Sequence, residues 1–138
     1  MAIIEKSKRG NTLFQKLLGH HEIYDDWNKL ATQLESKGQL SAKLKEEVRR
    51  MLAQNNHCQY CKAKGKPQGN ILDEKEQICI GFVDVYLKVG ENIPNEVIRL
   101  LKQYLTNIEI VELIAFISFT NCQQQFGALM KLEALDES

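Results

Sequence analysis

The feature that most constrains the fold of this chain is the stretch LTNIEIVELIAFISF in its second half. Thr106 and Glu109 have the spacing of a capping box, and Leu105 and Ile110 occupy the two positions of a hydrophobic staple, so we expect a helix to begin here. We expect it to run to about Leu132. Its first half is apolar on nearly every side, and a helix of this kind must be covered all round. The stretch therefore predicts a bundle of helices packed around this one.

Helical periodicity recurs along the rest of the chain, and the apolar/polar alternation typical of strands is nearly absent. Cap residues precede several of the periodic segments, and a proline sets the backbone angle at the start of another. The predicted helices follow Thr12, run from Asp25 to Ser36, follow Ser41, open at Cys58, follow Asp73 and follow Pro94. We therefore predict an all-α fold, a single-domain bundle of about six to seven helices.

Length and charge limit the domain organisation and the partners. The 138 residues suit one domain, with residues 1–11 as a flexible tail and residues 12–138 as the helical domain. The 18 basic and 18 acidic residues balance, so no overall field attracts nucleic acid or an anionic membrane surface. We expect neither as a partner. The long apolar helix is instead expected to pack against a second subunit, which predicts a homo-oligomer.

The chain shows no feature of a secreted or membrane-spanning protein. Its first residues lack the apolar core of a signal peptide, and its most apolar stretch is shorter than the roughly 20 residues that span a bilayer. We therefore expect a cytoplasmic protein. Structural disulfides are rare in that reducing compartment, so a CxxC motif there indicates redox chemistry or metal binding.

Such a motif occurs in NNHCQYCKAKG, residues 55–65. Cys58 stands at a predicted helix N-terminus, where the helix dipole stabilises a thiolate, and Lys62 and Lys64 add positive charge nearby. Cys61 lies one helical turn further on and can condense with an oxidised partner to form a disulfide. These observations favour a dithiol that cycles through a disulfide, with Cys58 as the more acidic thiol.

Two other interpretations of the motif are weaker. A structural zinc site needs four ligands, and the chain contains no second CxxC and no HxxxH pair, so we predict neither a metal nor another cofactor. The cysteines could also be buried small hydrophobic residues, which is the role that we predict for Cys79.

The order of these features resembles a known family. The run LLGHHEIYDDWNKLATQLESKGQLSAKLKEEVRRMLAQNNHCQYC and the later DEKEQICIGFVDVYLKVG and YLTNIEIVELIAFISFTN are similar to the carboxymuconolactone decarboxylase superfamily, in its alkyl hydroperoxidase D-like (AhpD-like) branch. The resemblance covers about residues 12–132. It implies an all-helical fold that is commonly a trimer or hexamer. It also implies a thiol-dependent peroxidase that reduces a hydroperoxide and is regenerated by an external dithiol reductant.

The resemblance implies roles for individual residues. Glu46 corresponds to the glutamate of the family's active site, and Cys58 and Cys61 correspond to its dithiol. It implies that Cys61 attacks the peroxide and that Cys58 resolves the product, whereas the charge argument above favours Cys58, so the assignment stays open. From the residues alone, we would instead expect Glu46 to be a solvated side chain that pairs with Arg50 one turn away.

One departure from the family is important for function. The family has a histidine four residues past the second cysteine, and this chain has Gly65 there. His57, beside Cys58, could supply the missing acid/base group, and so could His20 or His21. Alternatively, the protein is a non-catalytic or redox-sensing member of the branch. A lactone decarboxylase, after which the superfamily is named, is a further alternative, but that branch generally lacks the CxxC.

Overall fold

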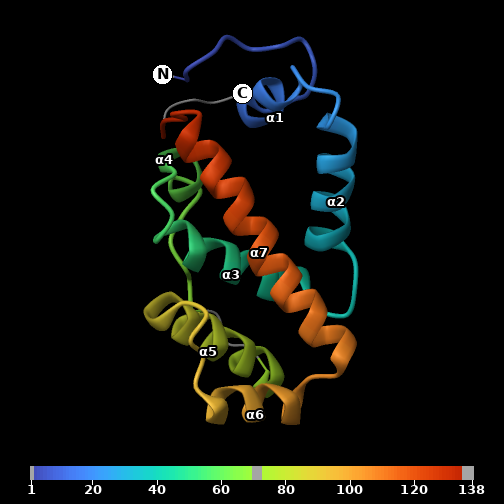
Figure 1. Ribbon diagram of the computed structural model, residues 1–138, viewed down its shortest axis with the longest axis vertical. Coiled ribbons are helices and arrows are strands. Elements are labelled where there is room, and N and C mark those ends of the chain that lie inside the picture. Colours follow the sequence, from blue (N-terminus) through green and yellow to red (C-terminus); the bar gives the residue numbers. More distant parts are fainter. Residues whose placement is uncertain (1, 70–72, 135–138) are drawn as a thin grey trace.

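The computed structural model describes residues 2–69 and 73–134 of the chain (Figure 1). Across these two ranges the regular secondary structure is entirely helical, which confirms the predicted all-α fold. The helices are α1 (Leu13–Leu18), α2 (Tyr24–Ser36), α3 (Ala42–Ala53), α4 (Gln59–Lys62), α5 (Glu74–Val89), α6 (Asn95–Tyr104) and α7 (Asn107–Leu129). The predicted loop of residues 65–72 lies partly outside the described residues.

The cap residues identified in the sequence define the helix starts. Thr12, Asp73 and Thr106 each form a complete capping box with the residue three positions on, and the Ser41 hydroxyl accepts a hydrogen bond from the Leu44 amide. These contacts satisfy amide groups that have no partner within the helix. The predicted starts of α1, α3, α5 and α7 are therefore confirmed.

Helix α7 runs diagonally along the molecule, and the other helices pack along its length (Figure 1). Helices α3, α5 and α6 surround its first half, α2 lies beside it, and α1 and α4 lie near its C-terminal end. It ends at Leu129, slightly earlier than predicted, and Lys131 then adopts a positive φ of 61°. Since α7 contacts helices at both ends of the molecule, it links the two hydrophobic clusters of the interior.

The larger cluster is the main core, formed by α3, α5, α6 and the first half of α7. Its buried residues are Leu40, Leu44, Val48, Leu52, Cys79, Phe82, Val83, Leu101, Leu105, Leu113, Phe116 and Ile117. The smaller cluster lies between α1, α4 and the end of α7, and consists of Leu13, Leu17, Ala53, Cys58, Tyr60, Cys61 and Leu132. The CxxC motif thus belongs to the smaller cluster, away from the main core.

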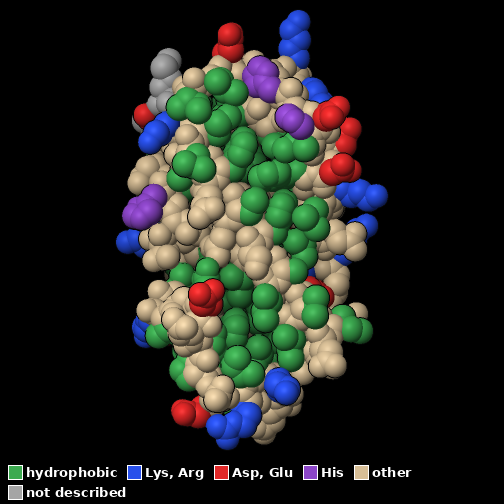
Figure 2. Space-filling view, viewed as in Figure 1, with side chains coloured by type: hydrophobic (Ala, Val, Ile, Leu, Met, Phe, Trp, Pro, Cys, Tyr) green, Lys and Arg blue, Asp and Glu red, His purple; other side chains and the backbone are tan. Residues whose placement is uncertain are grey.

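One side of α7 is exposed in the single chain. Ile108 and Val111 keep 68% and 67% of their surface accessible, and Ile114 keeps 43%. Hydrophobic side chains gather over the end of the molecule formed by α5, α6 and the start of α7 (Figure 2). This face would suit a second subunit, and the homo-oligomer stays a prediction.

The segment before α1 makes backbone hydrogen bonds to the helical domain. The Ile3 amide donates to the Met130 carbonyl at 3.1 Å, and the Ser7 amide donates to the Lys16 carbonyl at 2.9 Å. The division between a flexible tail of residues 1–11 and the domain that follows stays a prediction. Among the described residues, no helix combines the length and apolar character needed to cross a bilayer.

Candidate active site

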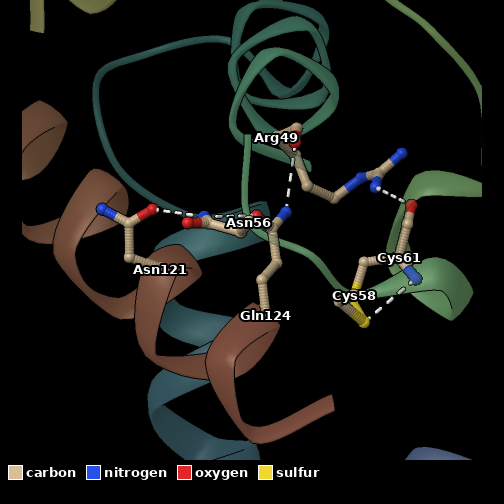
Figure 3. The surroundings of a disulfide bond; sticks show 6 residues. All are labelled: Arg49, Asn56, Cys58, Cys61, Asn121 and Gln124. Atoms are coloured by element: carbon tan, nitrogen blue, oxygen red, sulfur yellow. Dashed lines mark hydrogen bonds between the residues drawn. A yellow bond between two sulfur atoms is a disulfide. The ribbon is translucent and has the colours of Figure 1, made fainter. Parts of the chain in front are cut away.

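The CxxC motif forms the start of α4: Cys58 caps this helix and Cys61 lies within it. His57 has a positive φ of 25°, which turns the chain sharply before Cys58, the N-cap of α4. The Cys58 sulfur accepts a hydrogen bond from the Cys61 amide at 3.2 Å, and the two cysteines form a disulfide (Figure 3). In the reduced protein, a hydrogen bond from a backbone N–H to this sulfur would favour the thiolate, and the greater acidity of Cys58 stays a prediction.

A network of side-chain amides holds this turn against α7. Asn56 donates to Asn121 at 2.7 Å and to Gln124 at 2.8 Å, and the Gln124 amide donates to the Arg49 carbonyl at 3.2 Å (Figure 3). Asn121 in turn donates to the Tyr86 hydroxyl at 2.7 Å. Because polar groups buried beside a helix need such partners, the network fixes where α4 begins relative to α7.

The two sulfurs lie against a glycine of α7. A Cβ atom added at Gly127 would lie 2.5 Å from the Cys58 sulfur and 3.4 Å from the Cys61 sulfur. Any larger residue would therefore push the disulfide away from the helix. The absence of a side chain at Gly127 is what lets the dithiol pack directly on the α7 backbone.

The two cysteines differ in access. Cys58 is fully buried, whereas Cys61 keeps 7% of its surface accessible and lines an open cavity of about 270 Å³. The cavity lies between α1, α2, α3, α4 and α7, and its lining includes Thr12, Phe14, Gln15, Asn28, Thr32, Glu35, Arg49, Tyr60, Lys64, Thr120, Gln123 and Gln124. A small molecule can therefore approach Cys61 from the cavity, and Cys58 only through Cys61.

Glu46 lies on the side of α3 opposite its buried stripe, as the helical periodicity predicts. Its carboxylate pairs with Arg49, with nitrogen–oxygen distances of 2.8 Å to both oxygens, and with Arg50 at 2.9 Å. The hydrogen bond from Arg49 is the main cause that lowers the pKa of Glu46 to about 2, with Arg50 adding to it against the effect of burial. Glu46 is thus held ionised, and it reaches the motif through Arg49, whose Nη1 lies 3.5 Å from the Cys61 carbonyl oxygen.

The histidines do not contact the dithiol. His57 is exposed, and within the described residues its ring makes no hydrogen bond to either sulfur. His20 bonds the Glu5 carbonyl, and His21 accepts from the Ile23 amide, both in the segments around α1. At Gly65, where the resemblance would place a histidine, the nearest side-chain atom to an added Cβ is Nη1 of Arg50 at 3.2 Å. A guanidinium group therefore stands beside that position.

The remaining two cysteines differ in their burial. Cys79 is fully buried in the main core, as predicted, and Cys122 is exposed. In the part of the chain that the structure describes, no three His, Cys, Asp or Glu side chains cluster in a way that could hold a metal ion.

Comparison with known proteins identifies a structural relative. An uncharacterized peroxidase-related protein from Silicibacter sp. TM1040 superposes with a TM-score of 0.74 over 87% of this chain and 74% of its own, at 15% sequence identity. The two proteins share a fold. At this level of identity the likeness shows the fold alone. No protein-family model matches the sequence, and no curated protein matches it significantly.

Three features of the site escape sequence reasoning. Arg49 follows Glu46 at a spacing that suits an ion pair, but the spacing does not reveal that its guanidinium turns toward Cys61. Asn56 was identifiable as a turn residue, but not as the centre of an amide network. Gly127 has no local signal, because its role depends on sulfurs that lie far away in the sequence.

Proposed function

We propose that this protein is a thiol-dependent peroxidase that reduces hydroperoxides through a Cys58/Cys61 dithiol–disulfide cycle. The observation that carries the proposal is the asymmetry of the pair: Cys61 borders an open cavity, and Cys58 lies buried behind it at bonding distance. This asymmetry supports attack by Cys61 and resolution by Cys58. The peroxidase-related relative agrees with the proposal at the level of the fold.

The proposed cycle has three steps. The Cys61 thiolate attacks the terminal oxygen of the hydroperoxide, the O–O bond breaks, and the alkoxide takes a proton to leave as an alcohol. The Cys58 thiol then attacks the Cys61 sulfenic acid, which forms the disulfide and releases water. An external dithiol reduces this disulfide by exchange and becomes a disulfide itself, and the protein dithiol is restored. No metal or bound cofactor takes part, and the proposed setting is a cytoplasmic homo-oligomer, a trimer or hexamer.

The roles of Glu46 and His57 belong to the same proposal. Glu46 acts through Arg49, and His57 exchanges protons with the site through solvent, since its ring is exposed beside Cys58. The variant His57→Asn tests this role, because asparagine tolerates a positive φ better than most residues. If His57 supplies general acid/base catalysis, peroxide turnover should fall by about a hundredfold.

A peroxide-consumption assay with a dithiol reductant tests the cycle. Cys61→Ser should abolish turnover, and Cys58→Ser should leave a single oxidation that stops at the sulfenic acid. Cys122→Ser, which changes an exposed thiol outside the cavity, should leave the rate unchanged. Turnover in Cys61→Ser equal to that of the wild type would overturn the proposal.

A redox sensor is the second candidate, and the lack of an imidazole bonded to either sulfur within the described residues favours it. A sensor needs only one oxidation, without repeated proton delivery. It would form the Cys58–Cys61 disulfide stoichiometrically with peroxide but would turn over slowly with excess dithiol. Measuring the turnover number therefore separates the two candidates.

A further inference from the structure

The side chain of Arg49 pairs with the Glu46 carboxylate and also faces the backbone of Cys61. Two of its nitrogens hold the Glu46 carboxylate. The third, Nη1, faces the Cys61 carbonyl oxygen at 3.5 Å (Figure 3). Arg49 and Cys61 also line the same cavity. The guanidinium group is therefore fixed in orientation beside the Cys61 backbone, in the cavity that the Cys61 side chain also lines.

The ion pair does not cancel this positive charge. Glu46 contributes one negative charge, while Arg49 and Arg50 contribute two positive charges, so the cluster carries a net positive unit. Arg50 directs its own Nη1 to the Lys66 carbonyl at 3.2 Å, away from the cavity. Arg49 is thus the member of the cluster that brings charge to Cys61.

We propose that Arg49 is a positioning residue that stabilises the Cys61 thiolate by a fixed positive charge, in place of a proton-accepting partner. The inference rests on the proposed role of Cys61 as the attacking thiol. An arginine stays protonated throughout, so it can hold the thiolate but cannot take its proton. The thiol proton must then leave to water in the cavity, and reactivity should follow the ionisation of Cys61 itself.

Other charges face Cys61 from the surrounding elements. Lys64 follows α4 and adds positive charge to the cavity, and Glu35 of α2 opposes it from a position where it accepts from Gln123 at 3.3 Å. The cavity residues contributed by α1 and α7 are uncharged. The titratable and charged groups to consider are therefore Glu35, Glu46, Arg49, Arg50, His57, Tyr60, Lys62 and Lys64.

The test measures how fast iodoacetamide alkylates Cys61 in the reduced full-length protein, from acidic to alkaline pH, by mass spectrometry of the Cys61 peptide. Arg49→Gln should slow alkylation at neutral pH by about tenfold and move the midpoint of the pH curve upward by about one unit. Arg49→Met, which keeps most of the apolar stem of the side chain, should shift the midpoint by a similar amount. Arg49→Lys keeps the charge and should recover most of the wild-type rate.

Arg99→Gln is the matched control, because it removes one exposed positive charge from α6 without touching the site. Its curve should overlay that of the wild type. The inference is overturned if Arg49→Gln and Arg49→Met leave the curve unmoved, or if Arg49→Lys shifts it as far as they do. Since no peroxide is present, a wild-type protein without peroxidase turnover would refute the proposed function, while a shifted curve would still support the role of Arg49.

Discussion

Cys79 and Cys58 are both fully buried, but they differ in the cluster to which they belong and in their bonding partners. Cys79 lies in the main core among the side chains of α3, α5, α6 and α7, and desolvation raises the pKa of its thiol to about 12. Cys58 lies in the smaller cluster, accepts a backbone hydrogen bond, and is joined to Cys61 at the edge of a cavity.

The difference shows that burial alone does not decide whether a cysteine can react. The Cys79 thiol in the closed core stays protonated, because the loss of water raises its pKa more than the charge of Lys75 lowers it. In the smaller cluster, the Cys58 sulfur accepts a hydrogen bond from the Cys61 amide, and the cavity gives access to Cys61. The proposed charge of Arg49 would add to this effect. The protection of Cys79 and the proposed reactivity of Cys61 thus follow from the same rules applied to two environments.

The largest expected effect is a difference between the alkylation rates of the core cysteine Cys79 and an exposed cysteine. In the reduced native protein, Cys79 should react with iodoacetamide at least about a thousandfold more slowly than exposed Cys122, because it reacts only when the core opens. Peptide-resolved mass spectrometry measures both rates, and in denaturant all four cysteines should react alike. Similar native rates for Cys79 and Cys122 would contradict the closed core.

The second prediction concerns the stability of the main core around Cys79. Leu113→Ala removes a side chain that is 1% exposed, so it should lower the free energy of unfolding by about 2–5 kcal/mol. Chemical denaturation measures the loss. Val111→Ala, on the same helix but 67% exposed in the single chain, should change the stability of the monomer by less than about 0.5 kcal/mol, whereas a second subunit on this face would increase the loss. A loss for Val111→Ala as large as for Leu113→Ala would mean that this face is covered.

The third prediction concerns the contact between Gly127 and the two sulfurs of the smaller cluster. Gly127→Ala places a methyl group 2.5 Å from the Cys58 sulfur, so the turn must shift, at a cost of about 1–3 kcal/mol. Gly81→Ala is the matched control in α5, where an added Cβ meets nothing within 4 Å. Since alanine favours a helix over glycine, this control should gain about 0.5–1 kcal/mol. Thermal melts should thus move in opposite directions, and equal shifts would show that Gly127 is not a tight contact.

The helical framework was largely predictable because its signals are local. Thr106 and Glu109 mark the start of α7 within four residues, and the apolar spacing of Leu44, Val48 and Leu52 defines the buried face of α3. Such contacts form between neighbours in the sequence, so capping and periodicity report them directly. Contacts between residues far apart in the sequence, such as those of α3 with α5 and with α7, have no such local signal.

The candidate site was predictable only in part, for the opposite reason. The CxxC spacing identified the dithiol, but its setting comes from Gln124 and Gly127 of α7, more than sixty residues away in the chain. The predicted part of Glu46 in catalysis stays a prediction, and the structure adds its pairing with Arg49. Periodicity placed Glu46 on the outer side of α3, but it could not show which way a long arginine side chain would turn.

The smallest expected effect comes from substituting Glu46. The direction in which the alkylation rate of Cys61 changes decides between two roles for this residue. The pKa of Glu46 is lowered to about 2 by Arg49 and Arg50, so its ion pairs stabilise the fold above pH 4.5 and lose this effect as the pH falls toward 2. Because the carboxylate is half exposed, Glu46→Gln should cost about 1 kcal/mol or less at neutral pH, and its stability should fall less steeply in acid. Denaturation at several pH values measures this, with Glu22→Gln as the exposed control.

The Glu46→Gln variant also removes the negative charge that offsets Arg49, so alkylation of Cys61 at neutral pH should become faster. A slower reaction would instead indicate that Glu46 takes the thiol proton, and would contradict the fixed-charge role of Arg49.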